Sequence, residues 1–221
     1  MKTKRSVVIT GGTSGFGYEL MKAFSEEGWA VAVCGRRKDR IERIRHENGN
    51  VLAEICDIRI EPAIALFLKK VKTELGGIDV LILNAGSIGP LPLPKIEDLG
   101  IEGLRLTFET NFFGNFNFLK YSLPILRKGG MVIHVTSDAA TVPYPGWGAY
   151  SSSKAAFDAI IRVLSVELKE NGIDAFSYDP GDMDTEMHHL ALPDDHSHLE
   201  NPKNSAKILL KEIARRLEKN E

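Results

Sequence analysis

A glycine-rich turn near the amino end of the chain constrains its fold more than any other feature. The turn, Gly11-Gly-Thr-Ser-Gly15-Phe-Gly17, follows an apolar run and precedes a helical pattern of apolar residues: Phe16, Leu20, Met21, Phe24 and Trp29. Glycine lets the backbone approach a phosphate closely, and the N-terminus of the helix offers unpaired N–H groups. This order predicts a phosphate-binding βα unit, although Gly-x-x-x-Gly-x-Gly is not the commoner Gly-x-Gly-x-x-Gly spacing.

Strand-like and helix-like segments then alternate along the chain. Strands are predicted at residues 5–10, 29–34, 51–55, 79–83, 131–136 and 173–178, and helices between and after them include residues 104–126, 147–170 and 202–217. The alternation predicts an α/β protein with a Rossmann-like, doubly wound parallel sheet of about six strands and helices on both faces. With 221 residues and neither a repeat nor a linker, the chain is expected to form one domain over residues 1–221.

Charge and composition argue against several classes of partner. The formal net charge of −2 gives no general attraction to nucleic acid or to an anionic membrane surface. No apolar run approaches the ~20 residues that cross a bilayer, and the apolar run after Arg5 is too short for a signal peptide. We therefore expect a cytoplasmic protein in which Cys34 and Cys56 are free thiols.

The end of the second predicted strand bears on the choice of nucleotide. An acidic residue there would bond the ribose 2′-hydroxyl of NAD, whereas this chain has Gly35 followed by Arg36 and Arg37. A guanidinium suits a 2′-phosphate, so the sequence favours NADP. The alternative is a solvated basic start to a helix, which is the interpretation we adopt for Lys38 and Arg40.

Polar or small residues also follow other predicted strands, namely Asp57, the run Asn84-Ala85-Gly86, and Ser137. Ligands of open parallel sheets bind outside the carboxyl ends of the strands, so these residues should line one crevice. Beyond them, Tyr150 and Lys154 are four residues apart in a predicted helix and share one face of it. A free tyrosine titrates near pH ~10, and a fixed cation nearby lowers the pKa of the phenol.

Taken together, these residues resemble the short-chain dehydrogenase/reductase family in its compact single-domain form, from about Lys4 to Thr185. The resemblance rests on the glycine turn, Asn84-Ala-Gly86, Asn111, Ser137, Tyr150-x-x-x-Lys154 and Pro180-Gly-Asp-Met-Asp-Thr185, all in the family's order and spacing. Residues 144–150 and 179–187 show a weaker, local similarity to its sepiapterin reductase and benzil reductase branch. The late acidic residue that would support a pterin substrate is missing.

The resemblance implies a catalytic role for four residues. Tyr150 would exchange a proton with the substrate oxygen, and Lys154 would lower the pKa of that tyrosine and bond the nicotinamide ribose. Ser137 would hold the substrate oxygen. Asn111 would anchor a water that links Lys154 to solvent. In addition to Tyr150 and Lys154, the implied NADP(H)-binding residues are Gly11, Thr13, Ser14, Gly15, Phe16, Gly17, Arg36, Arg37, Asp57, Ile58, Asn84, Ala85, Gly86, Pro180, Gly181, Met183 and Thr185.

The resemblance also suggests how the site closes and how the chain assembles. Residues at about 186–201 would form a lid over the substrate. Their four histidines could suggest a metal, but nothing in the sequence fixes convergent ligands, so we expect none and leave open that one histidine contacts substrate. Many relatives add a further strand after a helix like that at 202–217, and without it a homodimer is expected instead of a tetramer.

The expected function is NADPH-dependent reduction of a carbonyl compound to an alcohol. Two alternatives remain: an NAD-preferring alcohol dehydrogenase, in which Arg36 is merely solvated, and an NADP(H)-binding sensor or scaffold without turnover. A relative acting on nucleotide sugars would have a larger substrate domain. The identity of the small-molecule substrate cannot be read from the sequence.

Overall fold

Six parallel strands form one sheet, as the sequence predicts. In this computed structural model, which describes residues 4–220, the strand order is β3-β2-β1-β4-β5-β6. The strands are β1 (Ser6–Thr10), β2 (Ala30–Gly35), β3 (Val51–Ile55), β4 (Ile78–Leu83), β5 (Leu126–Val135) and β6 (Asp174–Tyr178). All neighbouring strands run parallel. The order reverses between β1 and β4, and ligands of doubly wound sheets bind at such a reversal.

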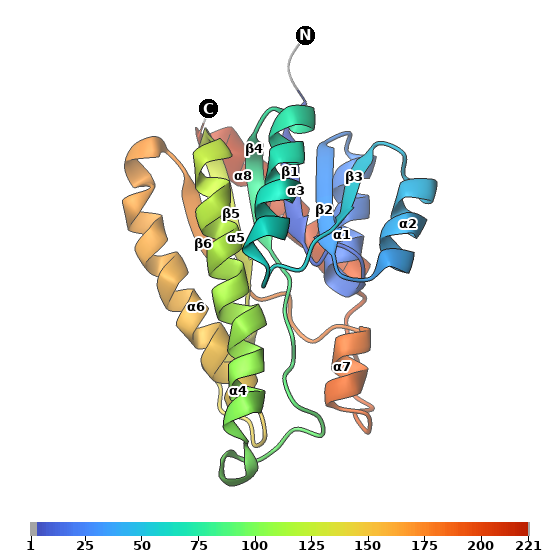
Figure 1. The fold of residues 1–221 in the computed structure, drawn as a ribbon, viewed down its shortest axis with the longest axis vertical. Coiled ribbons are helices and arrows are strands. Elements are labelled where there is room, and N and C mark those ends of the chain that lie inside the picture. Colours follow the sequence, from blue (N-terminus) through green and yellow to red (C-terminus); the bar gives the residue numbers. More distant parts are fainter. Residues whose placement is uncertain (1–3, 221) are drawn as a thin grey trace.

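Helices cover both faces of the sheet (Figure 1). The first face packs against α1 (Gly15–Glu26), α2 (Lys38–Glu47) and α8 (Pro202–Asn220), and the second against α3 (Glu61–Leu75), α5 (Asn115–Ser122) and α6 (Gly148–Glu167). Strand β1 shows why: Val7 and Ile9 belong to the first core and Val8 to the second, because successive side chains of a strand alternate faces. The predicted fold class is therefore confirmed.

Two further helices lie beyond the carboxyl ends of the strands: α4 (Ile101–Phe108), which leads toward α5, and the short α7 (Glu186–Ala191) (Figure 1). Short 3₁₀ helices occur at Ile96–Asp98, Leu123–Ile125, Asp138–Ala140 and Lys169–Asn171. Within residues 4–220, none of the helices combines the length and the apolar character that crossing a membrane requires.

Several predicted element boundaries are wrong. Trp29 lies outside α1, because the helix ends before Gly28, whose φ of 76° breaks the helical path; the Trp29 ring instead meets Phe24 edge-on. Strand β5 begins at Leu126 and not at Met131, since Leu126 already pairs with Ile78 of β4.

The predicted continuous helix over residues 104–126 is also wrong. A wide π-helical turn, Glu109–Gly114, separates α4 from α5. The side chain of Asn115 contacts this turn. Its Nδ2 donates to the main-chain oxygens of Thr110 and Asn111, each at 3.2 Å, and to that of Ala85 at 2.9 Å. The amide thus ties the turn to the loop after β4.

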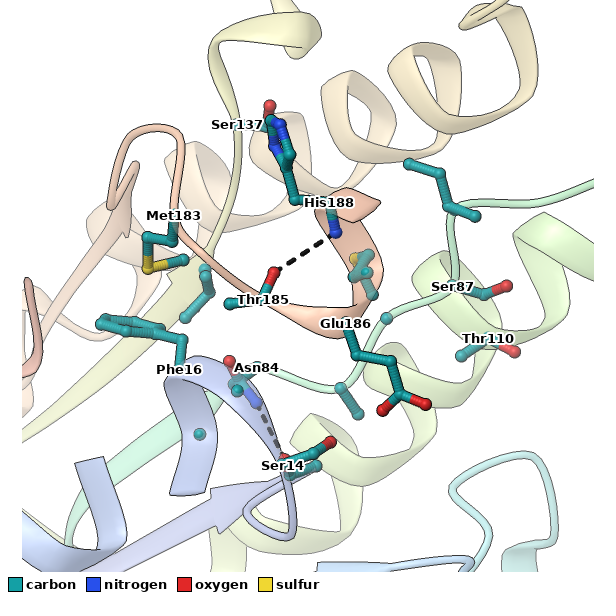
Figure 2. Close-up of a pocket in the computed structure, with 18 of the residues that line it drawn as sticks. Ser14, Phe16, Asn84, Ser87, Thr110, Ser137, Met183, Thr185, Glu186 and His188 are labelled. Atoms are coloured by element: carbon teal, nitrogen blue, oxygen red, sulfur yellow. Dashed lines mark hydrogen bonds between the residues drawn. The ribbon is translucent and has the colours of Figure 1, made fainter. Parts of the chain in front are cut away.

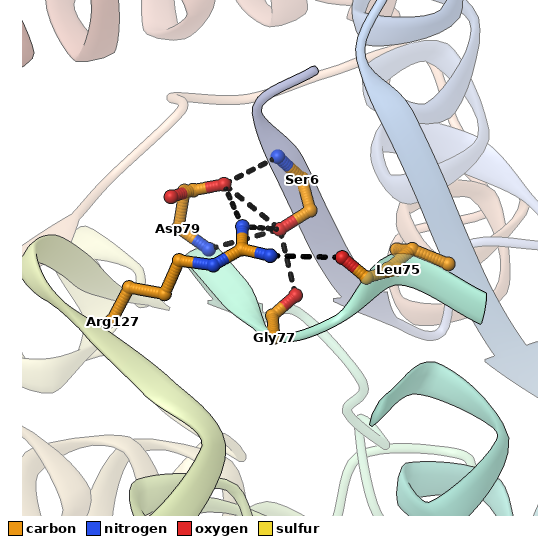
Figure 3. Close-up of polar contacts among 5 residues, drawn as sticks. All are labelled: Ser6, Leu75, Gly77, Asp79 and Arg127. Carbon is orange, nitrogen blue, oxygen red and sulfur yellow. Dashed lines mark hydrogen bonds and ion pairs between the residues drawn. The ribbon is translucent and has the colours of Figure 1, made fainter. Parts of the chain in front are cut away.

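A cluster of polar contacts joins three strands near their amino ends (Figure 3). Asp79 Oδ2 accepts hydrogen bonds from the Ser6 backbone N at 2.7 Å and from Arg127 Nη1 at 2.6 Å. The Ser6 hydroxyl donates to the carbonyl oxygen of Gly77, and Arg127 Nη2 to that of Leu75. These contacts join β1, β4 and β5 near their amino ends, at the opposite end of the sheet from the carboxyl ends of the strands.

Candidate active site

A cavity of about 800 Å³ lies at the carboxyl ends of the strands. Such a volume is ample for a small-molecule or cofactor site. The predicted site residues that line it are Gly11, Thr13, Ser14, Gly15, Phe16, Gly17, Arg36, Arg37, Asp57, Ile58, Asn84, Ala85, Gly86, Ser137, Tyr150, Lys154, Pro180, Gly181, Met183 and Thr185. Asn111 is the one predicted residue that does not line the cavity. The structure therefore brings the predicted residues together, while their individual roles stay predictions.

The glycine turn forms a cradle that side chains would fill. A Cβ added to Gly17 would lie 2.4 Å from Asn84 Nδ2, closer than any real contact allows. Gly11 and Gly15 have φ of 67° and 52°, a region in which other residues are strained. Figure 2 shows Asn84 beside this turn, where its Nδ2 donates to the carbonyl oxygens of Thr10 and Gly11. An exposed backbone at the start of α1 fits a bound pyrophosphate.

Arg37 and Arg40 contact the start of α7. Arg37 Nη2 donates to the Ser14 hydroxyl at 2.9 Å, and Nη1 lies 3.2 Å from both carboxylate oxygens of Glu186. Arg40 Nη2 donates to Glu186 Oε2 at 3.0 Å, so the interpretation of Arg40 as merely solvated is wrong. Lys38 is highly exposed and makes a long contact with Glu42. Arg36 is exposed and lines the cavity.

The part of the cavity next to β3 is lined by Asp57 and Cys56, which follow that strand. Asp57 pairs with Arg59 at 2.6 Å, and these hydrogen bonds are the main reason why the pKa of Asp57 is lowered. Both cysteines are free and buried. Cys56 also lines the cavity, from its position directly after β3.

Tyr150, Lys154 and Ser137 meet on the β4–β6 side. Tyr150 is 8% exposed and Lys154 3%. Lys154 Nζ donates to the carbonyl oxygen of Val135 at 2.6 Å and lies 5.7 Å from the centroid of the Tyr150 ring. Burial lowers the pKa of Lys154 to about 8, against the opposing influence of Asp158 and Asp179.

Burial is also the main influence on the phenol. It raises the pKa of Tyr150, and the charges of Asp179 and Asp138 add to this, whereas a hydrogen bond with Ser137 opposes it. Tyr150 in this state is a protonated acid, able to give a proton to a bound oxygen atom. The Ser137 hydroxyl also accepts from the Ala139 backbone N at 3.2 Å and donates to Asp138.

Asn111 is fully buried at the π-helical turn. Its Oδ1 accepts from the Ser87 backbone N at 2.7 Å, and its Nδ2 donates to the Ser87 carbonyl oxygen and to the Ser153 hydroxyl. Both amide hydrogens are thus committed to the protein and fix the loop after β4. That Asn111 anchors a water stays a prediction. Its two side-chain amide hydrogens are not available to bind that water, because both are donated to protein groups.

Residues 186–201 begin with α7, which is capped by Thr185: its Oγ1 accepts from the His188 backbone N at 3.3 Å (Figure 2). His188 lines the cavity, and its Nε2 lies 2.8 Å from Asp195 Oδ2. His189 pairs with Asp184. Within the part of the chain that the structure describes, no three His, Cys, Asp or Glu side chains are grouped to hold a metal ion.

Sequence reasoning missed several residues that line the cavity. Asp138, Asp179 and Asp182 are acidic neighbours of predicted site residues, and their positions just after β5 and β6 were a usable signal. Ile88 and Trp147 contribute apolar surface from two segments, residues 87–94 and 142–147, that the sequence indicated only as loops at the rim of the site. Glu186, Met187, His188, Leu190 and Ala191 come from α7, within the predicted lid at about 186–201, although the sequence did not single out which lid residues reach the cavity.

Comparison with protein families gives a match over residues 5–195 to the short chain dehydrogenase model. A short chain dehydrogenase of Pseudocercospora fijiensis is 36% identical over 199 residues, covering 86% of this chain and 62% of that protein. Serine 3-dehydrogenase of Agrobacterium fabrum is 33% identical over 185 residues, covering 82% of this chain and 73% of the relative.

The fold has relatives among solved structures as well. An alcohol dehydrogenase from the archaeon Thermococcus sibiricus, complexed with 5-hydroxy-NADP, superposes with a TM-score of 0.82 at 28% identity. The match covers 94% of this chain and 91% of that one.

Proposed function

Since this chain belongs to the short-chain dehydrogenase/reductase family and is an oxidoreductase of alcohol or carbonyl groups, we propose that it reduces a ketone or aldehyde to an alcohol with NADPH. The observation that carries the proposal is the buried Tyr150, protonated and one helical turn from Lys154, at a cavity that Ser137 also lines. A buried acid beside a cation suits the protonation of an oxygen that gains negative charge.

The residues divide the work as follows. A bound nicotinamide dinucleotide would supply a hydride to the carbonyl carbon of the substrate. Tyr150 gives its proton to the carbonyl oxygen, and the Ser137 hydroxyl holds that oxygen in place. Lys154 stabilises the phenolate that remains. Asn111 supports the geometry through Ser87 and Ser153, and the α7 region, residues 186–201, acts as the lid.

The preference for NADPH over NADH rests on the end of β2. The last residue of β2 is Gly35 and not an acidic residue, and Arg36 and Arg37, which follow it, line the cavity. A guanidinium can bind a 2′-phosphate through paired charged hydrogen bonds. The solved Thermococcus sibiricus relative carries an NADP derivative, which agrees with this preference.

We further propose one cytoplasmic catalytic domain that works as a homodimer. Apolar side chains are exposed along α4, the π-helical turn, α5 and α6, namely Ile101, Leu106, Phe113, Phe116, Val163 and Val166. Exposed apolar surface of this extent is typical of an interface with another protein surface. Two buried free thiols, Cys34 and Cys56, suit a reducing compartment.

The test is NADPH consumption with a panel of diketones, quinones, aldehydes, 3-oxoacyl thioesters and sepiapterin, with Tyr150→Phe as the matched variant. We expect turnover of at least one carbonyl class and a loss of about 10²-fold or more in the variant, which lacks only the hydroxyl. Equal rates for the two proteins would refute Tyr150 as the proton donor. A parallel series with NADH tests the cofactor preference, and Arg36→Ala should reduce it.

The alternative is an NADP(H)-binding sensor without turnover. It would show tight NADPH binding, with no carbonyl compound reduced at any pH. The buried Tyr150–Lys154 pair disfavours this role, because burying a lysine costs free energy and brings no advantage to a protein that only binds the nucleotide.

A further inference from the structure

A polar cluster around the buried His134 lies behind the Tyr150–Lys154 pair, and Thr136 is its one member that lines the cavity. Its centre is the carboxylate of Asp158, one helical turn beyond Lys154 on α6. Asp158 Oδ1 lies 2.9 Å from His134 Nδ1 and accepts from the Ser177 hydroxyl at 2.6 Å. Oδ2 accepts from the Thr136 hydroxyl at 2.8 Å. None of Asp158, His134 and Ser177 lines the cavity.

The cluster and Lys154 share three consecutive residues, His134 and Val135 at the end of β5 and Thr136 directly after it. The side chains of His134 and Thr136 point to the same face of the strand, toward α6, because alternate residues share a face. Val135 lies between them, and its carbonyl oxygen accepts from Lys154 Nζ at 2.6 Å. The carboxylate of Asp158 and the ammonium of Lys154 are therefore both anchored on one short stretch of strand.

The carboxylate of Asp158 carries a negative charge that His134 does not cancel. Three hydrogen bonds outweigh burial, so the pKa of Asp158 is lowered and the group is ionised at neutral pH. His134 is fully buried, and burial, followed by the charge of Lys154, lowers its pKa to about 4. The imidazole is thus neutral, with Nδ1–H donating to Asp158, and His134 Nε2 has no partner among residues 4–220.

The charge of Asp158 acts on Lys154, one helical turn away on α6, and raises the pKa of its ammonium group. Burial disfavours the ammonium form of Lys154, and Asp158 is the larger of the two opposing charges, ahead of Asp179 beyond β6. The other titratable groups that face Lys154 are Tyr150 on α6 and His134 on β5, and neither is an anion at neutral pH.

We propose that Asp158 is the counter-charge that keeps Lys154 a cation, and that His134, Thr136 and Ser177 hold its carboxylate in position. Asp158 touches neither substrate nor cofactor in this scheme and is a positioning residue. The inference rests on the function proposed for Tyr150 and Lys154, because a cationic lysine matters where it must stabilise a phenolate. In this arrangement α6 carries Tyr150, Lys154 and Asp158, and β5 holds the carboxylate that keeps Lys154 charged.

The first test measures Lys154 directly and needs no turnover. In protein labelled with ¹³C at the lysine ε-carbons, the NMR signal that disappears in Lys154→Met belongs to Lys154, and its shift against pH gives its titration midpoint. In Asp158→Asn we expect this midpoint to fall by about 1 pH unit or more, because a neighbouring opposite charge has been removed. An unchanged midpoint in a folded Asp158→Asn protein would overturn the proposal.

Three variants make the test specific. Ser177→Ala removes a hydrogen bond to Asp158 but keeps the charge, so its midpoint should stay within a few tenths of a unit of the wild-type value. Asp158→Glu keeps the charge, so its Lys154 midpoint should lie closer to the wild-type value than to that of Asp158→Asn. If Asp158→Asn fails to fold, the double variant His134→Phe/Asp158→Leu removes the charge together with its buried imidazole partner, and leaves without an acceptor only the Thr136 and Ser177 hydroxyls, which are partly exposed. It must give the same downward shift; a wild-type midpoint there also refutes the role of Asp158.

The kinetic counterpart separates this inference from the proposed function. The reduction rate should fall as pH rises through the Lys154 midpoint, and in Asp158→Asn this alkaline fall should move to lower pH by the same amount. If the wild-type protein reduces no carbonyl compound, the proposed function fails, while the NMR titration still decides the role of Asp158. If turnover occurs but the rate falls at the same alkaline pH in Asp158→Asn as in the wild type, the counter-charge has no part in the reaction.

Discussion

The guanidinium of Arg37 and the carboxylate of Glu186 join the β2–α2 corner to the first turn of α7, with Nη1 3.2 Å from each carboxylate oxygen. Arg37 is one of the two arginines proposed to bind a 2′-phosphate. Hydrogen bonds from Arg40 and Arg37 lower the pKa of Glu186, so this carboxylate is ionised at neutral pH. Glu186 would therefore compete with such a phosphate for the same guanidinium.

Removing this competing charge should tighten NADPH binding. In Glu186→Gln we expect the Kd for NADPH to fall by about 2- to 5-fold, a modest change because an exposed ion pair is screened by solvent. NADH has no 2′-phosphate and provides the control: its Kd should stay unchanged. Fluorescence titration with both nucleotides measures the two values, and an equal change for both would contradict the competition.

The glycine cradle should not tolerate a side chain at Gly17. In Gly17→Ala the new Cβ would lie 2.4 Å from Asn84 Nδ2 and 2.5 Å from the Gly11 carbonyl oxygen, so the turn has to move. We expect at least ~10-fold weaker NADPH binding, since overpacking of about 1–3 kcal/mol distorts the cradle. Gly49→Ala is the matched control, because nothing lies within 4 Å of a Cβ there. Binding equal to the wild type in Gly17→Ala would refute the cradle.

The polar contacts at the amino ends of the strands should govern stability and not catalysis. Arg127→Met leaves the Asp79 carboxylate without its ion-pair partner, and we expect the free energy of unfolding to fall by about 1–3 kcal/mol. Arg105→Met breaks the highly exposed Arg105–Glu102 pair and should change it by less than about 0.5 kcal/mol. Urea unfolding measures both, and equal effects would contradict the importance of burial.

Protonation of His134 should destabilise the fold at acidic pH. Its folded pKa of about 4 lies below the ordinary 6.5, so the unfolded chain binds more protons between these values. The free energy of unfolding therefore falls as pH is lowered from 6.5 to 4, by up to roughly 3 kcal/mol from this group. Urea unfolding at several pH values should show a shallower fall in His134→Asn. Removal of the exposed His46 by His46→Asn should leave the wild-type slope, and an equal slope in all three proteins would refute the prediction.

The fold and the outline of the site were predictable because their signals are local. β-branched runs end in small or polar residues, and parallel strands bring all those ends to one edge. That geometry explains why Gly11, Asp57, Asn84 and Ser137 line one cavity.

Other features depend on contacts between residues that are distant in sequence. Asp158 and His134 lie 24 residues apart, and Glu186 meets Arg37 across 149 residues, with no spacing that marks either pair. Asn111 shows a different limit: its place in the order of motifs was readable, but the direction of its amide depends on the π-helical turn around it.

That turn also restricts how the length of this region can vary. Asn111 lies within the wide turn at Glu109–Gly114 and Asn115 directly after it, and both side chains are fully buried and held by main-chain groups of the loop after β4. Deleting one residue between them would turn Asn115 by roughly 100° relative to Asn111, so the two amides could no longer both reach their partners in the loop after β4. Insertions and deletions should therefore be purged from this segment over evolutionary time, even where single substitutions survive.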